Sequence, residues 1–252
     1  MDLGLTGKRA LVTGASAGIG RAIARELANE GVTVCLAARR EPLLEELAAE
    51  IVEKGGPQPV IATVDLLDPD EPGRLAQRAV ELLGGVDILI NAAGGSRNEI
   101  DWVTAPDEEW EREMVMNYTQ IRRLTMPVVD QMRPLGWGRI VNITGKAEPA
   151  AMLGCHPAKA AVHNWAKGLS REVGPYGITV NSLPPGKIMS EQILRKYTPE
   201  FREEFAKTQI PVGRFGEPEE MAYIAACLCS PRAAFVTGNV LHVDGGQHRF
   251  AF

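Results

Sequence analysis

The chain has 252 residues, of which 45% are hydrophobic and 23% charged, and its formal net charge is −5. This composition is typical of a globular protein, and the lack of a basic excess argues against nucleic acid or an anionic membrane as a partner. No apolar run is long enough to span a membrane, and the opening MDLGLTGKRALVTG lacks the layout of a signal peptide. The four cysteines form no zinc pattern and favour a reducing compartment. We therefore expect a cytoplasmic protein without a metal site.

Strand-like and helix-like segments alternate along the whole chain. In chain order we expect strand 9–13, helix 19–29, strand 32–37, helix 42–54, strand 60–64, helix 75–83, strand 87–90, helix 107–132, strand 139–143, helix 158–173, strand 178–182, helix 217–229 and strand 240–243. Because the strands are apolar throughout and alternate with helices, they predict a parallel sheet covered on both faces. Pro127 lies inside the longest helix and predicts a kink or a break there.

No linker, repeat or low-complexity run divides the chain, so we expect a single domain over residues 1–252. Residues 187–214 depart from the alternation, because this stretch is polar and helical and contains Pro199 and Pro211. Its position near the last strands predicts a lid over a pocket.

A glycine-rich loop, TGASAGIG, joins the first strand to the first helix. Gly14 allows a tight turn, Gly18 lets the backbone approach a pyrophosphate, and Gly20 lets the helix pack closely on the strand. The free N–H groups at the helix N-terminus favour phosphate binding. A flexible turn is the alternative, but a strand before the loop and a helix after it are the context of dinucleotide binding. The cofactor-binding residues expected here are Gly14, Ser16, Gly18, Ile19 and Gly20.

The second strand ends in Ala38-Arg39-Arg40. An acidic residue at this point would bind the adenosine ribose 2′-hydroxyl, and none is present. The planar guanidinium of Arg39 suits a 2′-phosphate instead. A solvated arginine pair is the alternative. We favour NADP(H) over NAD(H) as the cofactor.

The spacing Thr13-Gly14-x-x-x-Gly18-x-Gly20 resembles that of the short-chain dehydrogenase/reductase family. Further matches, in order along the chain, are Asn91-Ala92-Ala93-Gly94, Asn117 seven residues after Trp110, Pro185-Gly186-x-x-x-Ser190, residues 211–220 and Val243-Asp244-Gly245-Gly246. The resemblance spans essentially the whole chain. It implies one α/β Rossmann-type domain with a doubly wound, mainly parallel sheet of seven strands, helices on both faces, and assembly as a homotetramer.

The same resemblance implies cofactor contacts beyond the glycine-rich loop. These are Asp65 and Leu66 beside the adenine, Asn91, Ala92 and Gly94 beside the ribose and pyrophosphate, Lys159 on the nicotinamide ribose, and the loop of Pro185, Gly186, Ile188 and Ser190 on the carboxamide.

The family's proton chemistry uses a serine, a tyrosine four residues before a lysine, and an asparagine. Lys159 and Asn117 stand in the expected places. Cys155 occupies the tyrosine position, and Gly145 occupies the serine position with Thr144 just before it. The loop between the two is also a few residues shorter than is usual in the family. We therefore expect an altered proton donor.

Several groups are candidates for that donor. Cys155 carries a thiol that a nearby lysine would activate, although cysteine is more often a small buried filler than a catalyst. His156 has the side chain best suited to proton transfer near neutrality, but its direction on the helix differs by about 100° from that of its neighbour. Lys146 and Glu148 lie in the shortened loop. His163 is interpreted as a packing or subunit-interface residue.

These observations predict an oxidoreductase that interconverts an alcohol and a carbonyl with NADP(H). Its candidate catalytic residues are Lys159, Asn117, Cys155, Thr144 and His156. Two alternatives remain open, a non-redox lyase or isomerase using the same pocket and a catalytically silent dinucleotide-binding protein. The lysine and asparagine favour an active enzyme, whereas the missing tyrosine favours the alternatives.

The expected partners are a small-molecule substrate and further copies of the chain. Arg97, Lys146 and Lys187 follow the fourth, fifth and sixth strands, where this fold binds ligands, and so suggest an anionic substrate. Solvated loop charges are the alternative. Small and aromatic residues such as Ala160 and Trp165 lie on several faces of helix 158–173, so a partner helix and a homo-oligomer are expected, in agreement with the family's tetramer.

Overall fold

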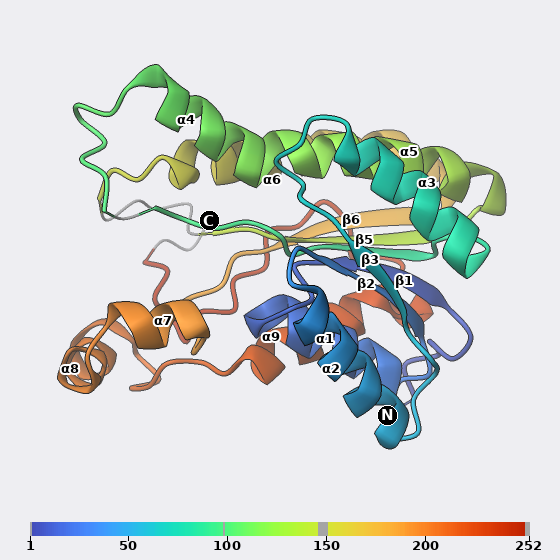
Figure 1. Cartoon of the computed structure of the whole chain (residues 1–252), viewed down its shortest axis with the longest axis horizontal. Helices are drawn as coiled ribbons and strands as arrows, with labels where there is room; N and C mark the ends of the chain where they lie inside the picture. The colour runs from blue at the N-terminus through green and yellow to red at the C-terminus, as the bar shows by residue number, and fades with distance from the viewer. Residues whose placement is uncertain (1, 98, 146–150, 250–252) are drawn as a thin grey trace.

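The computed structural model describes residues 2–97, 99–145 and 151–249. In this part of the chain, six strands form one parallel sheet in the order β3-β2-β1-β4-β5-β6 (Figure 1). Their bounds are β1 Arg9–Thr13, β2 Thr33–Ala38, β3 Val60–Thr63, β4 Ile88–Asn91, β5 Gly138–Ile143 and β6 Ile178–Leu183. The strand order reverses between β1 and β4, which is the point where doubly wound sheets leave a crevice for a ligand. The predicted Rossmann-type α/β fold is confirmed.

Helices cover both faces of the sheet (Figure 1). One face carries α1 Gly18–Asn29, α2 Glu41–Glu53 and α9 Pro218–Cys229, and the other carries α3 Glu71–Leu83, α4 Asp107–Met114, α5 Gln120–Met132 and α6 Cys155–Val173. Beyond the carboxyl edge of the strands lie α7 Glu191–Lys196 and α8 Pro199–Gln209, within the segment predicted to be a lid. None of the described helices combines the length and apolar character needed to cross a membrane.

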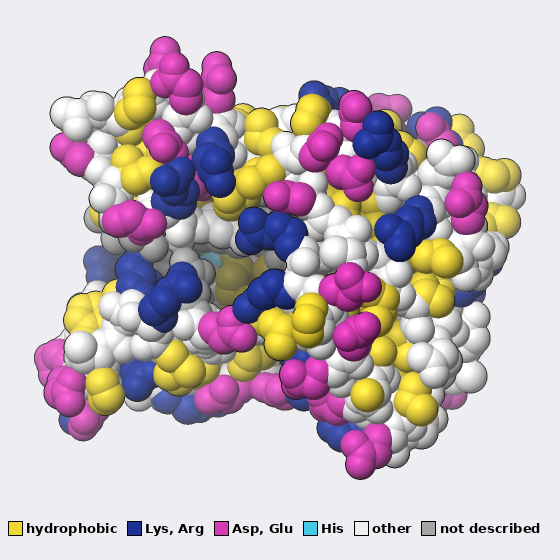
Figure 2. All heavy atoms as spheres, in the orientation of Figure 1, with side chains coloured by type: hydrophobic (Ala, Val, Ile, Leu, Met, Phe, Trp, Pro, Cys, Tyr) yellow, Lys and Arg dark blue, Asp and Glu magenta, His cyan; other side chains and the backbone are white. Residues whose placement is uncertain are grey.

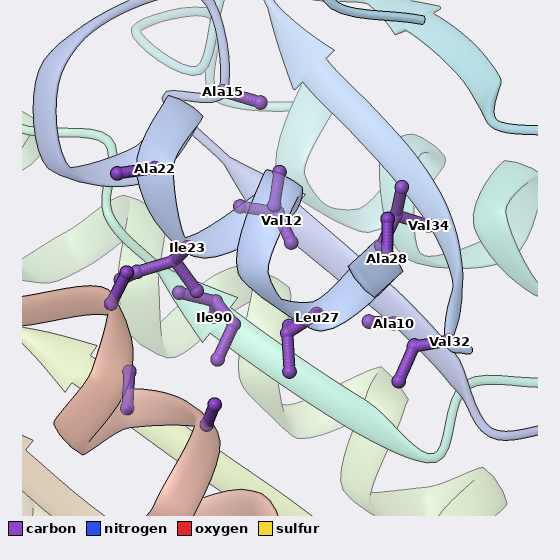
Figure 3. Packing of buried hydrophobic residues seen from close by; sticks show 14 of the residues in the cluster. Ala10, Val12, Ala15, Ala22, Ile23, Leu27, Ala28, Val32, Val34 and Ile90 are labelled. Atoms are coloured by element: carbon purple, nitrogen blue, oxygen red, sulfur yellow. The ribbon is translucent and has the colours of Figure 1, made fainter. Parts of the chain in front are cut away.

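The packing of α1 on the sheet fixes the start of this helix at the carboxyl edge. Ile23 and Leu27 lie one helical turn apart and therefore share a face. Both are fully buried against β1 and β4, where they meet Val12 and Ile90 (Figure 3). Burying an aliphatic side chain of this size contributes about 1.5–3 kcal/mol. The helix thus cannot shift along the sheet without losing this contact.

The seventh strand, predicted over residues 240–243, is not part of the sheet. This segment runs beside β6 in isolated parallel bridges. The backbone N–H of Val243 donates to the Pro184 carbonyl at 3.2 Å, but Pro184 has no N–H with which to donate in return. Pro184, in the adjacent segment, therefore interrupts the hydrogen-bond ladder. The described residues form a sheet of six strands, so the prediction of seven is wrong by one.

The helix predicted over residues 107–132 is interrupted at an unexpected place. A π-helical turn, Val115–Thr119, separates α4 from α5, and α5 continues through Pro127 without a break. Pro127 is on the exposed side of the helix, where water can satisfy the carbonyl that loses its partner. Of the kink or break predicted at Pro127, the break does not occur. The π-helical turn contains Asn117, and such turns are frequent at functional sites.

An ion pair ties the beginning of β1 to that of β4. The Nε of Arg9 donates to Oδ2 of Asp87 at 2.8 Å, and Nη2 donates to Oδ1 at 2.9 Å. Burial opposes ionisation of Asp87, but the hydrogen bonds and charge of Arg9 outweigh it and hold the pKa of this carboxyl below its usual value.

We predict that Asp87→Asn lowers the free energy of unfolding by about 1–3 kcal/mol at neutral pH, because it removes a charge-assisted pair. The pKa of Asp87 is lowered in the folded state, so its contribution is present above the unfolded-state pKa and is lost as the pH falls below about 4. Urea unfolding of both proteins at neutral and acidic pH measures this. A difference in stability that did not shrink in acid would contradict the prediction.

Candidate active site

A cavity of about 480 Å³ opens at the carboxyl edge of the sheet. Figure 2 shows a hollow on this side of the molecule, between the end of the layer that contains α4 and the pair α7 and α8, with Lys and Arg side chains around its rim. The cavity walls come from the loops after all six strands, β1 to β6, and from the start of α7. Its size and its place at the reversal of strand order are those of a small-molecule or cofactor site.

Most of the predicted cofactor contacts line this cavity. They are Gly14, Ser16, Gly18, Ile19, Gly20, Arg39, Asp65, Leu66, Ala92, Gly94, Lys159, Pro185, Ile188 and Ser190. Two predicted residues lie behind the wall. The Nδ2 of Asn91, which is fully buried, donates to Oδ1 of Asn142 at 2.8 Å and so joins the ends of β4 and β5. Gly186 packs against Asp244, whose Cα would lie 2.6 Å from an added Cβ.

The glycine-rich loop has the geometry that a bound pyrophosphate requires. Gly14 has a φ of +68°, and a Cβ on it would lie 2.9 Å from the carbonyl carbon of Ala92. A Cβ on Gly20 would lie 2.8 Å from the carbonyl carbon of Gly14, so no side chain fits between the helix and the strand. No side chain caps the N-terminus of α1. Its N–H groups therefore remain available to phosphate oxygens at the cavity wall.

Both arginines at the end of β2 line the cavity, but their contacts differ. The Nη1 of Arg40 donates to Oε2 of Glu191 at 3.0 Å, and Nη2 donates to Oγ of Ser16 at 3.3 Å. Arg40 thus connects the glycine-rich loop to α7. Arg39 is exposed and forms no hydrogen bond or ion pair with another described residue, so its guanidinium is available to a ligand.

Lys159 reaches the cavity from α6. Its Nζ donates to the Thr144 carbonyl at 3.1 Å. A Cβ on Gly145 would lie 2.6 Å from Cδ of Lys159, so the lysine stem occupies the space that a serine at this position would need. Burial lowers the pKa of Lys159, and the anionic forms of Cys155 and Glu113 act in the opposite direction.

Neither Cys155 nor His156, the other candidate proton donors in the described residues, lines the cavity. Cys155 is 3% exposed and lies outside the cavity wall, and burial raises the pKa of its thiol although the charge of Lys159 lowers it. His156 is also absent from the wall. Lys146 and Glu148 lie outside the described residues. The buried thiol is therefore neither ionised nor in contact with the cavity.

Thr144 and His163 form a pair that the sequence interpretation missed. Thr144 is buried, and its Oγ1 lies 2.7 Å from Nε2 of His163 on α6. Burial lowers the pKa of His163 to about 4, so the ring is neutral at physiological pH. The prediction that His163 serves only packing or an interface overlooked this contact. The available signal was its spacing of one helical turn after Lys159.

Neither Asn117 nor Glu113 lines the cavity, but Asn117 connects Gly95 in the cavity wall to the carboxyl of Glu113, which was not predicted. The Oδ1 of Asn117 accepts from the Gly95 N–H at 3.1 Å, and its Nδ2 donates to Oε2 of Glu113 at 2.8 Å. Both Asn117 and Glu113 are buried. The sequence signal for Glu113 was its place four residues before Asn117, because residues four apart share a helix face.

The predicted cationic residues have partners of their own. Arg97 forms an ion pair with Glu109. The Nζ of Lys187 donates to the hydroxyl of Tyr197 at 3.3 Å and lies 5.0 Å from the centre of that ring. Neither cation stands as an isolated charge beside the cavity.

The parallel sheet, the glycine-rich loop at the reversal of strand order and the adjoining cavity define a Rossmann-type nucleotide-binding protein. A family model described as enoyl-(acyl carrier protein) reductase matches residues 14–248. The chain belongs to the short-chain dehydrogenase/reductase family, whose members are NAD(P)-dependent oxidoreductases.

Relatives and solved structures agree with this assignment. The chain is 34% identical to 3-oxoacyl-(acyl-carrier-protein) reductase FabG of Aquifex aeolicus, with 98% of this chain and 100% of that protein covered. It is 32% identical to 7alpha-hydroxysteroid dehydrogenase of Escherichia coli, with 97% and 96% covered. L-sorbose reductase from Gluconobacter frateurii, solved with NADPH and L-sorbose, has a TM-score of 0.92 and 32% identity over 98% of each chain. A 7 alpha-hydroxysteroid dehydrogenase was solved with NADH and has a TM-score of 0.90, with 32% identity over 97% of this chain and 96% of that chain. A nicotinamide dinucleotide is therefore the cofactor class that this family site binds.

Proposed function

We propose that the protein interconverts a small carbonyl compound and its alcohol with NADP(H), and that Lys159 exchanges the proton. The observation that carries this proposal is the position of Lys159, which lines the cavity while Cys155 is buried behind it. The names of the relatives, which are reductases and a dehydrogenase, support redox chemistry. They do not favour the lyase, isomerase or silent-protein alternatives.

The chemistry requires a proton at the substrate oxygen. When bound, the dinucleotide supplies or accepts the hydride at the carbonyl carbon. Because burial lowers the pKa of Lys159, its ammonium is a stronger acid near neutrality than an ordinary lysine. The Thr144 carbonyl holds Nζ, and the contact with His163 holds Thr144 in place. With glycine at position 145 and cysteine at position 155, this ammonium replaces the hydroxyl groups of the family.

We also propose that the substrate is anionic. The proposal of an anionic substrate is supported by the Lys and Arg side chains around the hollow in Figure 2. Arg97 and Lys187 would then bind the substrate only by exchanging their present partners, Glu109 and Tyr197.

We predict that Lys159→Ala lowers turnover by about 100-fold or more at saturating NADPH, the scale of general acid catalysis. Cys155→Ala is the matched control on the same helix face, and it should keep turnover within a few-fold because the thiol does not reach the cavity. The assay follows NADPH oxidation with an oxoacyl thioester, L-sorbose and a 7-oxo bile acid. Loss of activity in the cysteine variant, or full activity in the lysine variant, would contradict the assignment of Lys159 as the proton donor.

The preference for NADP(H) is proposed from Arg39, which lines the cavity and whose guanidinium forms no hydrogen bond or ion pair with another described residue. Arg39→Asp should weaken NADPH binding by roughly 10- to 100-fold, because a charge-assisted contact is worth about 1.5–3 kcal/mol. NADH affinity should change much less. Calorimetry with both cofactors measures this, with Arg74→Asp on α3 as a control for altered net charge. Equal affinity for NADPH before and after the substitution is incompatible with the proposal.

We further propose that the protein is a cytoplasmic homo-oligomer, most simply a tetramer. Large apolar side chains, including Phe235, Tyr223 and Leu241, are exposed on the single chain. Cys35, Cys155, Cys227 and Cys229 are all free thiols, as suits a reducing compartment. Exposed apolar surface of this kind favours association. Sedimentation velocity at micromolar concentration should show a species of several chains, and a monomer would count against the proposal.

A further inference from the structure

Glu113 is a buried carboxyl that the proposed mechanism has not used. It lies on α4 and is fully buried. Its Oε2 accepts from Nδ2 of Asn117 at 2.8 Å, whereas its Oε1 has no hydrogen-bond partner in the described part of the chain. No described lysine or arginine forms an ion pair with it. A buried carboxyl with an unpartnered oxygen and no ion pair favours its protonated form.

This carboxyl lies against the start of α6, at the corner where the family places its tyrosine. A Cβ on Gly154 would lie 2.9 Å from Cγ of Glu113 and would also meet the ring of Trp102. The missing side chain of Gly154 therefore lets the glutamate approach α6 beside Cys155. Trp102 is buried at the same corner. The space near position 155 is thus bordered by a glutamate side chain from α4 instead of a phenol from α6.

Glu113 and Lys159 are coupled electrostatically. Burial raises the pKa of Glu113, while the Asn117 hydrogen bond, the charges of Lys159 and Arg97 and the backbone N–H of Arg97 lower it. Burial lowers the pKa of Lys159, while Cys155 and Glu113 raise it. His163 follows Lys159 by one turn on the same helix, α6, and is neutral, because burial lowers its pKa to about 4. The protonation state of each group therefore depends on that of the other.

We propose that Glu113 is the proton reservoir of the site, whose carboxyl restores the proton of Lys159 after each reduction. This inference rests on the proposed function. The hydride forms the new C–H bond, and the Lys159 ammonium gives its proton to the carbonyl oxygen and becomes a neutral amine. The Glu113 carboxyl then protonates the amine and becomes a carboxylate, which solvent later reprotonates. Alcohol oxidation runs through the same steps in reverse. Glu113 acts only through Lys159, by returning a proton to its amine, and is therefore a positioning residue and not a catalytic one.

The central test is Glu113→Gln, which keeps the size of the side chain and an acceptor for Asn117 but has no proton to give. Glu111→Gln, on the exposed side of the same helix, is the matched control. We expect the first variant to lose roughly 10- to 100-fold in turnover, with unchanged NADPH affinity, and the control to match the wild type. The shorter carboxylic acid of Glu113→Asp should restore part of the loss. Thermal unfolding with NADPH shows whether each variant is folded.

The pH profile supplies a readout that a merely structural role would not change. Reduction requires the protonated lysine, so the rate falls as the pH rises through the Lys159 pKa. The carboxylate that Glu113 becomes at higher pH raises the Lys159 pKa, and glutamine cannot form it, so Glu113→Gln should move this fall to lower pH. An unchanged pH profile together with full turnover in Glu113→Gln would contradict the role of Glu113 as the proton reservoir.

Infrared difference spectra between the wild type and Glu113→Gln, both with NADP bound, give a readout that needs no turnover. The wild type should show the carbonyl band of a protonated carboxyl at neutral pH, and the variant should lack it. Turnover by the wild type without this band would overturn the reservoir alone. Absence of turnover with every carbonyl compound tested would overturn the proposed function, and the reservoir with it.

Discussion

The close approach of α1 to the end of β1 is the constraint on which the cavity depends. Gly20 lies against the carbonyl of Gly14, and Gly14 in turn lies against Ala92 in the loop after β4. The Thr13 hydroxyl holds the two strands together at this point, since it donates to the Ile90 carbonyl at 3.2 Å and accepts from the Ala92 N–H at 3.0 Å. A side chain at either glycine would separate helix from strand and withdraw the N–H groups from a bound phosphate. The crevice exists because three backbone segments meet at residues without a large side chain.

The same use of missing side chains recurs at the proton-transfer end of the cavity. Gly145 leaves room for the stem of Lys159, and Gly154 leaves room for Glu113. In the proposed alignment Gly145 takes the position of the family's serine, and Gly154 directly precedes Cys155 at the position of its tyrosine. A side chain at either glycine would displace the lysine or the glutamate, so these positions are coupled in space. This coupling is a reason to interpret the altered residues as one rearranged site, as proposed above, rather than as separate losses.

The sequence predicted what depends on local pattern. Apolar runs such as DILI and RIVNI became β4 and β5 because buried parallel strands need no polar face. It failed where a distant residue decided the outcome. Segment 240–243 has strand-like residues, but Pro184 beside it removes the donor that a ladder needs. Nothing in the polar run DEEWEREM distinguishes Glu113 from its exposed neighbours, and only the packing of Gly154 and Trp102 shows that Glu113 is enclosed. Cofactor contacts could be predicted because they lie on loops with fixed spacing, whereas the proton-transfer groups depend on contacts between α4 and α6.

Stability alone does not explain the presence of Glu113. The corner formed by Trp102, Gly154 and Cys155 is enclosed, and an apolar side chain of similar volume would fill it without an unpartnered oxygen. Leaving a buried polar atom unsatisfied costs about 1–3 kcal/mol, which is a large share of the 5–15 kcal/mol, roughly, that stabilises a typical domain. Asn117 satisfies only one of the two oxygens, so the cost is not removed by its hydrogen bond. Strained and imperfectly satisfied groups of this kind concentrate at functional sites. A carboxyl retained at that cost, coupled to the lysine at the cavity wall, is better explained by the proton it can hold than by the packing it provides.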